Sequence, residues 1–140
     1  IGVDRMFLAI FSSSLKFEKL DDGTERTVLK TPYILSPYKV AFLPLLKKDG
    51  LPEYCRKIKD KLKLKFSTVY DEKDAIGRRY RRQDAIGTPF CVTIDHQTID
   101  DDTVTIRDRD CMKQDRIHVN EIHNFLDSSL DINNWLLNSD

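Results

Sequence analysis

Arginine is concentrated in the stretch from Asp71 to Asp110, and its guanidinium group can do several kinds of chemistry. Four arginines stand close together and two more follow on a later segment, in the order Arg78, Arg79, Arg81, Arg82, Arg107 and Arg109. Guanidinium groups bind phosphates, stack on bases and hydrogen-bond the edges of bases. We therefore expect this stretch to contact a polyanion, and a single-stranded nucleic acid fits that chemistry.

A structural role is the alternative for the same arginines. The cluster around Arg79 can be a solvated helix face with local pairs to Asp74 and Asp84, although arginine at this density, rather than lysine, favours polyanion contact. Arg107 and Arg109 share one face of a predicted strand because they are two residues apart. For these two, pairing with Asp95 or another acid is as reasonable as contact with a nucleic acid, and the sequence leaves both possibilities open.

Composition and charge indicate one globular domain. The chain has 140 residues, of which 40% are apolar, so it is long enough to form a core. The net charge is zero, yet residues 47–65 carry eight Lys or Arg against three Asp or Glu, while residues 118–140 carry four acids and no Lys or Arg. Such asymmetry allows a neutral protein to present a basic face. Because there is no long apolar run and no signal-peptide pattern, we expect a cytoplasmic protein.

No catalytic or metal-binding constellation is apparent in the sequence. The three histidines have no evident partner, and the five glycines are scattered rather than gathered in a phosphate-binding loop. Cys55, Cys91 and Cys111 are odd in number and lack metal-ligand spacing, so we expect them to be buried, reduced thiols. These observations favour a binding module, and we expect neither a metal site nor a complete catalytic site.

Hydrophobic periodicity predicts a three-layer α/β domain with a mixed sheet. Leu51, Tyr54, Cys55, Ile58 and Leu62 form the apolar stripe of an amphipathic helix that connects two parallel strands. The other elements expected in this domain are strands over residues 38–46, 66–70, 89–95 and 103–108 and helices over residues 71–87 and 120–130, with an acidic turn at 100–102.

The second helix region has recognisable start and stop signals. Asp74 is expected to be its N-cap, and Gly87, which precedes Thr-Pro, is expected to end it. Ile76, Tyr80 and Ile86 are expected to face the core, and Gly77 is expected to mark a close backbone approach or an irregular first turn. Outside the domain we expect an apolar helix over residues 1–17, a turn-rich linker over 18–36 and a tail over 131–140.

Two long runs of the sequence carry a resemblance to a known family. PYKVAFLPLLKKDGLPEYCRKI begins at Pro37, and AIGRRYRRQDAIGTPFCVTIDHQTIDDDTVTIRDRDCMKQDRI begins at Ala75. Both resemble the C-terminal anticodon-binding domain of class II aminoacyl-tRNA synthetases, and within that class the dimeric glycyl-tRNA synthetases. Upstream, Gly2-Val3-Asp4-Arg5 before an apolar segment resembles the end of motif 3 in the catalytic domain. The resemblance implies the end of a catalytic domain in residues 1–17, a linker in 18–36, and an anticodon-binding domain in 37–130 with a mostly parallel five-stranded sheet flanked by helices.

The resemblance also implies roles for individual residues. Arg5 would contact an ATP phosphate, and residues Gly2, Val3 and Asp4 would supply the adjoining ATP-site backbone. By the same resemblance, the start of the second helix and an arginine on a later strand read anticodon bases. The glycine anticodons end in two cytosines, and an acid such as Asp74 or Asp95 would accept a hydrogen bond from a cytosine amino group. The expected anticodon-binding residues are Lys73, Asp74, Arg78, Arg79, Asp95, Arg107 and Arg109.

For the parent protein, the resemblance implies ATP-dependent ligation of glycine to tRNA(Gly), with ATP and Mg as cofactors and a homodimeric assembly. Motifs 1 and 2 and the glycine pocket are absent from these 140 residues, so we expect this chain alone to be inactive as a ligase. The alternative is a non-catalytic nucleic-acid-binding accessory protein that reuses the same fold, as a polymerase accessory subunit does; the Gly2 to Arg5 segment argues against it. A small metabolite-binding enzyme is disfavoured by the lack of a phosphate loop.

Overall fold

A computed structural model of the chain describes residues 15–21, 23–30, 33 and 36–130. The expected motif 3 segment from Gly2 to Arg5 and the expected tail over residues 131–140 lie outside the described residues. No helix in the described part of the chain is long and apolar enough to cross a membrane.

A mixed five-stranded sheet forms the centre of the domain, in the order β4-β3-β5-β6-β7. Its strands are β3 (Val40–Pro44), β4 (Thr68–Tyr70), β5 (Phe90–Ile94), β6 (Thr103–Asp108) and β7 (Gln114–His118). β3 pairs in parallel with β4 and β5, whereas β6 pairs antiparallel with both of its neighbours. Only β6 therefore runs against the other four strands, and the prediction of a mixed, mostly parallel sheet is confirmed.

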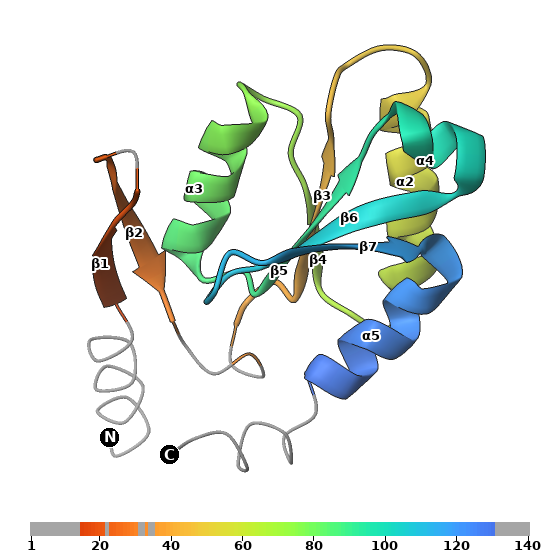
Figure 1. Ribbon diagram of the computed structural model, residues 1–140. Helices are drawn as coiled ribbons and strands as arrows, with labels where there is room; N and C mark the ends of the chain where they lie inside the picture. The colour runs from red at the N-terminus through yellow and green to blue at the C-terminus, as the bar shows by residue number, and fades with distance from the viewer. Residues whose placement is uncertain (1–14, 22, 31–32, 34–35, 131–140) are drawn as a thin grey trace.

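Helices cover both faces of this sheet, as the three-layer prediction requires. Figure 1 shows α3 on one side of the strands and α2 and α5 on the other. The helical segments are α2 (Leu51–Leu62), α3 (Ile76–Ile86), α4 (His96–Asp101), the 3-10 turn η2 (Val119–Glu121) and α5 (Ile122–Ser129).

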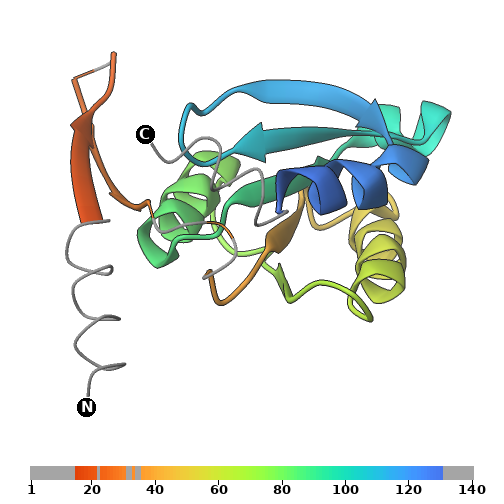
Figure 2. The ribbon, with the colours of Figure 1, turned by 90° about the horizontal axis from the view of Figure 1, so that it is seen from below.

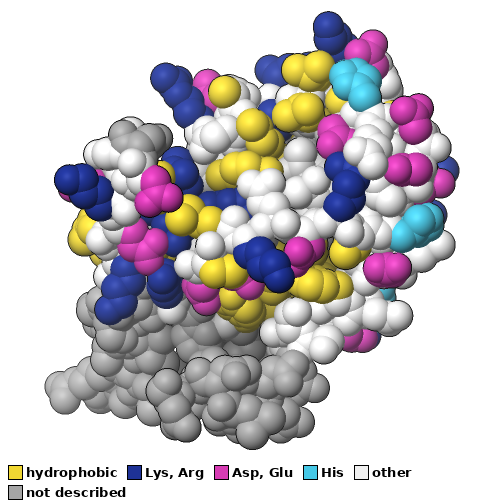
Figure 3. Space-filling view, viewed as in Figure 1, with side chains coloured by type: hydrophobic (Ala, Val, Ile, Leu, Met, Phe, Trp, Pro, Cys, Tyr) yellow, Lys and Arg dark blue, Asp and Glu magenta, His cyan; other side chains and the backbone are white. Residues whose placement is uncertain are grey.

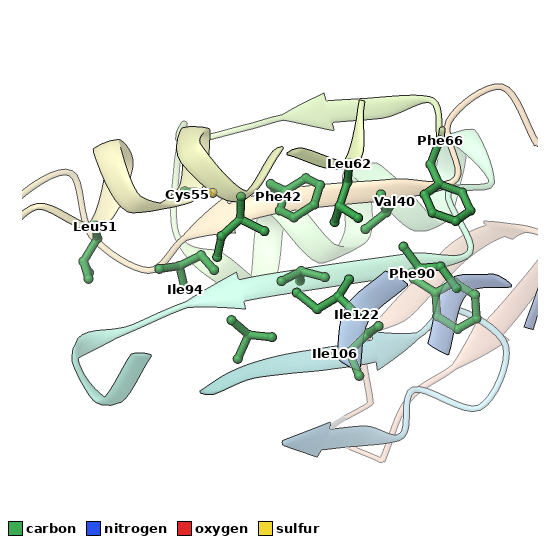
Figure 4. Close-up of a cluster of buried hydrophobic side chains, with 14 residues drawn as sticks. Val40, Phe42, Leu51, Cys55, Leu62, Phe66, Phe90, Ile94, Ile106 and Ile122 are labelled. Atoms are coloured by element: carbon green, nitrogen blue, oxygen red, sulfur yellow. The ribbon is translucent and has the colours of Figure 1, made fainter. Parts of the chain in front are cut away.

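The larger core lies between the sheet and the pair α2 and α5. The predicted stripe of α2 is confirmed, because Leu51, Cys55, Ile58 and Leu62 are all buried. Figure 4 shows this stripe facing the side chains of β3, β5 and β6. Pro52 occupies the first turn of α2, where a missing N–H costs nothing.

A smaller core lies beneath α3, on the opposite face of the sheet. Ala41, Leu43 and Cys91 are buried there against the half-buried Ile76 and Tyr80, two of the three residues that were expected to face inward. Ile86 does not face inward, since it is 40% exposed. Fewer apolar side chains are buried on this face, and polar contacts therefore contribute more to the attachment of α3.

The start of α3 differs from the prediction, while its end agrees with it. The N-cap is Ala75, without a side-chain cap, because Asp74 lies one residue earlier in the left-handed region at φ 67°. A Cβ on Gly77 would meet nothing within 4 Å, so no close backbone approach explains that glycine. Gly87 ends the helix at φ 84°, and a Cβ there would lie 3.1 Å from the Leu29 carbonyl oxygen. Only glycine fits this left-handed position so close to another backbone.

Residues expected to form a linker contain a β-hairpin instead. Its strands β1 (Leu15–Lys19) and β2 (Glu25–Leu29) pair antiparallel, and the turn between them includes Gly23 at φ 88°. On β2, Arg26, Val28 and Leu29 are buried. Residues 15–17 are therefore strand rather than the end of the expected helix. Figures 1 and 2 show the hairpin beside α3.

Two more elements replace expected irregular structure. The acidic segment forms the short helix α4, which a capping box between Asp95 and Thr98 starts. β7 was not expected, because its residues QDRIH lack apolar alternation. Cys55 and Cys91 are buried as expected, but Cys111 is exposed.

Candidate nucleic-acid interface

Arg79 is not available as a surface contact, because it is 2% exposed and bonded to the backbone. Its guanidinium group donates to the carbonyl oxygens of Pro44 and Leu45 at the end of β3, and to that of Asp71 at 3.2 Å just after β4. All three carbonyls lie beyond the last pair of the β3–β4 ladder, which is Phe42 with Tyr70. Arg79 thus fixes the start of α3 against the carboxyl ends of two parallel strands.

Arg107 is likewise an internal residue, 3% exposed. It donates two hydrogen bonds to Asp84, at 2.8 and 3.1 Å, and its guanidinium carbon lies 4.7 Å from the centre of the Tyr80 ring. Burial disfavours the charge, but the hydrogen bonds and attraction from Asp84 outweigh it and raise the pKa of Arg107. In this arrangement Arg107 is a charged structural residue that binds α3 to β6.

The same buried carboxylate of Asp84 attaches the hairpin. Arg26 of β2 donates to it at 3.0 Å and to the Arg109 carbonyl oxygen at 2.9 Å, and Arg81 donates to it at 3.2 Å. Arg26 is also paired with Glu18 of β1. A network centred on Asp84 therefore connects β1, β2, α3 and β6.

Arg109 follows β6 and is 1% exposed. Its Nη1 donates to the Gly87 carbonyl oxygen at 2.9 Å, its Nε donates to Asp110 at 2.9 Å, and its guanidinium group lies over the Tyr33 ring. Arg107 and Arg109 were expected to read bases, and Arg79 was expected to be a surface contact. All three side chains are buried, so they have no accessible surface for these roles. Of the alternatives left open by the sequence, internal pairing with an acid describes Arg107, with Asp84 as the acid.

Other expected residues do lie on the surface, at the carboxyl edge of the parallel strands. Lys73, Asp74 and Arg78 are exposed in the β4–α3 connection and the first turn of α3. Arg82 pairs with Asp71 and, at 2.6 Å, with Asp74, which holds this connection in place. Neither Lys73 nor Arg78 has an ion-pair partner among the residues that the structure describes. Ligands of open α/β sheets bind at this edge.

Asp95 lies at the same edge, at the end of β5, and its carboxylate binds the guanidinium group of Arg116. Arg116 of β7 donates to both of its carboxylate oxygens, at 3.0 and 2.9 Å, and to Thr103 at 2.7 Å. The hydrogen bonds from Arg116 are the main reason why the pKa of Asp95 falls to about 2. At neutral pH the pair is ionised, and Arg116 remains exposed. The surface here presents an exposed guanidinium group, bonded to Asp95, Thr103 and Thr105, beside a carboxylate acceptor.

Charged side chains of both signs lie near this edge. Figure 3 shows Lys and Arg side chains, with Asp and Glu beside them, along the upper rim of the face, above the start of α3 and the loop before α2. In residues 15–30 and 36–130, where described, no group of three or more His, Cys, Asp or Glu is placed to hold a metal ion. The edge is suited to an anionic ligand that also carries hydrogen-bonding groups.

Comparison with known families agrees with this chemistry. The sequence profile of the anticodon binding domain matches residues 39–129. The chain belongs to this family. A solved structure with a similar fold is the RNA-binding domain of threonyl-tRNA synthetase from Cryptosporidium parvum. That structure matches with a TM-score of 0.65 at 21% identity, over 71% of this chain and 25% of the other, and it shows the shared fold.

Sequence relatives of this anticodon-binding domain are glycine–tRNA ligases. The chain is 50% identical over 128 residues to the enzyme of Mycoplasma mycoides, 45% over 126 residues to that of Borrelia hermsii, and 47% over 131 residues to that of Clostridium beijerinckii. These alignments cover 90% or more of the chain. The chain spans only 28% of the length of each of these ligases.

Arg116 is the surface residue of the anticodon-binding domain that the sequence analysis missed. The structure brings it to Asp95 from a strand that the apolar pattern did not predict. A signal was present, because Arg116 is an isolated arginine a few residues after Arg107 and Arg109 and shortly before the turn at Val119–Glu121. That signal became informative only once the neighbouring strands were paired.

Proposed function

We propose that this chain binds tRNA at the anticodon, as the anticodon-binding part of a glycine–tRNA ligase. One observation carries the proposal: identity of 45–50% to glycine–tRNA ligases over 90% or more of the chain, inside which the anticodon binding domain profile matches residues 39–129. The parent protein would ligate glycine to tRNA(Gly) in the cytoplasm as a homodimer, using ATP and Mg. Gly2, Val3, Asp4 and Arg5 would belong to its ATP site, on the sequence resemblance to motif 3.

The proposed anticodon contacts are the charged residues on the carboxyl edge. Lys73 and Arg78, which are exposed cations, would bind phosphates there, and Asp74 would take part in the β4–α3 connection beside them. Arg79, Arg107 and Arg109 would support this edge from inside rather than touch RNA. This division follows from exposure, since guanidinium groups of residues that are only 1–3% exposed are out of reach of a base.

The Asp95 and Arg116 pair is proposed to read a cytosine. Glycine anticodons end in two cytosines, and the pairing edge of cytosine offers one amino donor and two acceptors. Oδ2 of the Asp95 carboxylate accepts from Arg116 and has a lone pair left for the amino group. The five N–H groups of Arg116 are bonded to Asp95, Thr103 and Thr105, so the cytosine acceptors would replace its bonds to the two threonines. A good base contact of this kind contributes about 1–3 kcal/mol of discrimination against the wrong base.

Binding to two anticodon stem-loops tests this proposal. One RNA carries the glycine anticodon, and in the other the two cytosines are replaced; salt is held near physiological strength. We expect the 140-residue chain to prefer the cytosines by about tenfold or more, which corresponds to about 1.4 kcal/mol. Equal binding to both RNAs would contradict anticodon reading by this chain.

Three variants then separate base contacts from phosphate contacts. Arg116→Ala and Arg116→Lys should both reduce the preference for the cytosines, because lysine keeps the charge but not the fork. Arg78→Ala should weaken both RNAs by the same factor and leave the preference unchanged. If Arg116→Ala also weakened both RNAs alike, Arg116 would be a phosphate contact.

A further inference from the structure

A groove runs along α2, on the opposite side of the sheet from α3. It consists of two adjoining hollows of about 240 and 280 Å³ between α2 and the β7–α5 connection, and both are lined by Ile58, Lys61, Val119 and Asn120. Figures 1 and 2 show α2 and α5 side by side. The groove is open to solvent and belongs to none of the contacts assigned above.

Two lysines of α2 give this groove a positive charge. Lys57 and Lys61 are exposed, lie one helical turn apart on the same side of α2 and both line the first hollow. Neither has an ion-pair partner among the residues that the structure describes. The lysines just beyond the end of α2 differ, since Lys63 pairs with Asp60 at 3.4 Å and Lys65 pairs with Asp127 at 2.7 Å. The charges of Lys57 and Lys61 therefore remain available to an external anion.

Neutral donors line the same hollow. His118 accepts a hydrogen bond at Nδ1 from the backbone N–H of Asn120, at 3.1 Å, so the neutral imidazole carries its proton on Nε2 and Nε2 is a donor. At one end of the hollow, the hydroxyl of Tyr54 donates to Asp102 at 2.5 Å. Asp102 also lines this hollow, and the hydrogen bond occupies one of its carboxylate oxygens. Charged and neutral donors converging on one groove are the chemistry that recognises phosphate oxygens.

We propose that this groove binds the phosphodiester backbone of the RNA strand that leads away from the anticodon. The position of α2 supports the route, because the helix begins after the carboxyl end of β3, at the edge assigned to the anticodon. At 1.5 Å per residue, Lys57 and Lys61 lie about 9 and 15 Å along the axis from Leu51. A strand seated on the edge can continue down the groove. The proposal rests on the proposed function, since it takes the anticodon arm as the ligand.

The test compares two double variants that remove the same charge. Lys57→Ala with Lys61→Ala empties the groove of cations, and Lys16→Ala with Lys19→Ala removes two exposed lysines from β1, which lies beyond α3. Binding of each chain to the cognate and the cytosine-replaced stem-loops is measured from 0.05 to 0.5 M salt. Thermal unfolding of each variant confirms that it is folded.

The expected result follows from counterion release at a single strand, which contributes a slope of about 0.7 per phosphate contact in a plot of log affinity against log salt. The groove variant should lose about 1.4 from that slope and bind both RNAs about 25-fold more weakly at 0.1 M salt. Its preference for cytosines should be unchanged, and the β1 variant should bind like the parent chain.

Two outcomes would refute the proposal that the groove binds the RNA backbone. An unchanged slope in the groove variant would show that no phosphate is bound there, and an equal loss in the β1 variant would reduce the effect to overall charge. The proposed function fails separately. If the unsubstituted 140-residue chain binds both RNAs equally while the groove variant still has a smaller salt slope, phosphate binding in the groove is supported and base reading is refuted. A parent chain that binds neither RNA refutes both proposals.

Discussion

Replacing Asp84 by Asn should be among the most damaging single changes in this domain. Asp84 is fully buried and accepts hydrogen bonds from Arg26, Arg81 and Arg107. The side chains of Arg26 and Arg107 are 0% and 3% exposed, so the asparagine variant leaves two guanidinium groups in the interior with less opposing charge. Breaking a buried pair by removing one partner costs about 3–5 kcal/mol. A domain is stable by only about 5–15 kcal/mol, so this loss is a large part of the total.

Urea unfolding at neutral pH, followed by circular dichroism, measures the change. Asp60→Asn is the matched control, because Asp60 is exposed and pairs with Lys63 across one turn of α2; its removal should change the free energy of unfolding little. In Asp84→Asn, amide exchange should accelerate first in β2, which the network attaches to α3. If both variants unfolded at the same urea concentration, the buried network would not be what holds the hairpin, and the reasoning would be wrong.

Glycines and thiols provide further tests. Gly87→Ala should destabilise the domain by about 1–2 kcal/mol, since the left-handed backbone penalises a Cβ and the added atom meets the end of β2; an unchanged melting temperature would contradict this. Gly77→Ala should stabilise it by about 0.5–1 kcal/mol, because that helical site is open, and a loss would show an unseen contact. A thiol reagent should label only Cys111 in the native chain, because burial raises the pKa of Cys55 and Cys91 to about 12; mass spectrometry that found rapid labelling of either would refute their burial.

Apolar periodicity was sufficient to predict the central elements of the fold. The stripe of α2 and the strands β3 and β5 are each set by residues that are close in sequence and share one buried environment. Gly87 was also predictable, because a helix that ends before Thr-Pro favours glycine in the left-handed conformation. Local physics decided all of these features.

The hairpin, β7 and the roles of the arginines depend on distant partners. β1 and β2 have alternating charged residues that resemble a loop until Arg26 meets Asp84, 58 residues later. For Arg107 the sequence left contact with a nucleic acid and pairing with Asp95 or another acid equally open, because its actual partner, Asp84, lies 23 residues away on another element. Asp95 is instead paired with Arg116. The sequence shows which charges exist, but pairing among them is a property of the assembled sheet.

The attachment of the hairpin affects how anticodon-binding domains can be exchanged between ligases. The family profile starts at residue 39, which suggests a breakpoint there for building chimeras. A cut at that position would remove Arg26 and so leave the buried Asp84 with fewer hydrogen-bond donors. It would also expose the side of α3 against which Val28 and Leu29 are buried. A chimera that carries the hairpin with the domain keeps donor and acceptor from the same parent. The natural breakpoint therefore lies upstream of Leu15, and grafts made at residue 39 should express as poorly soluble protein.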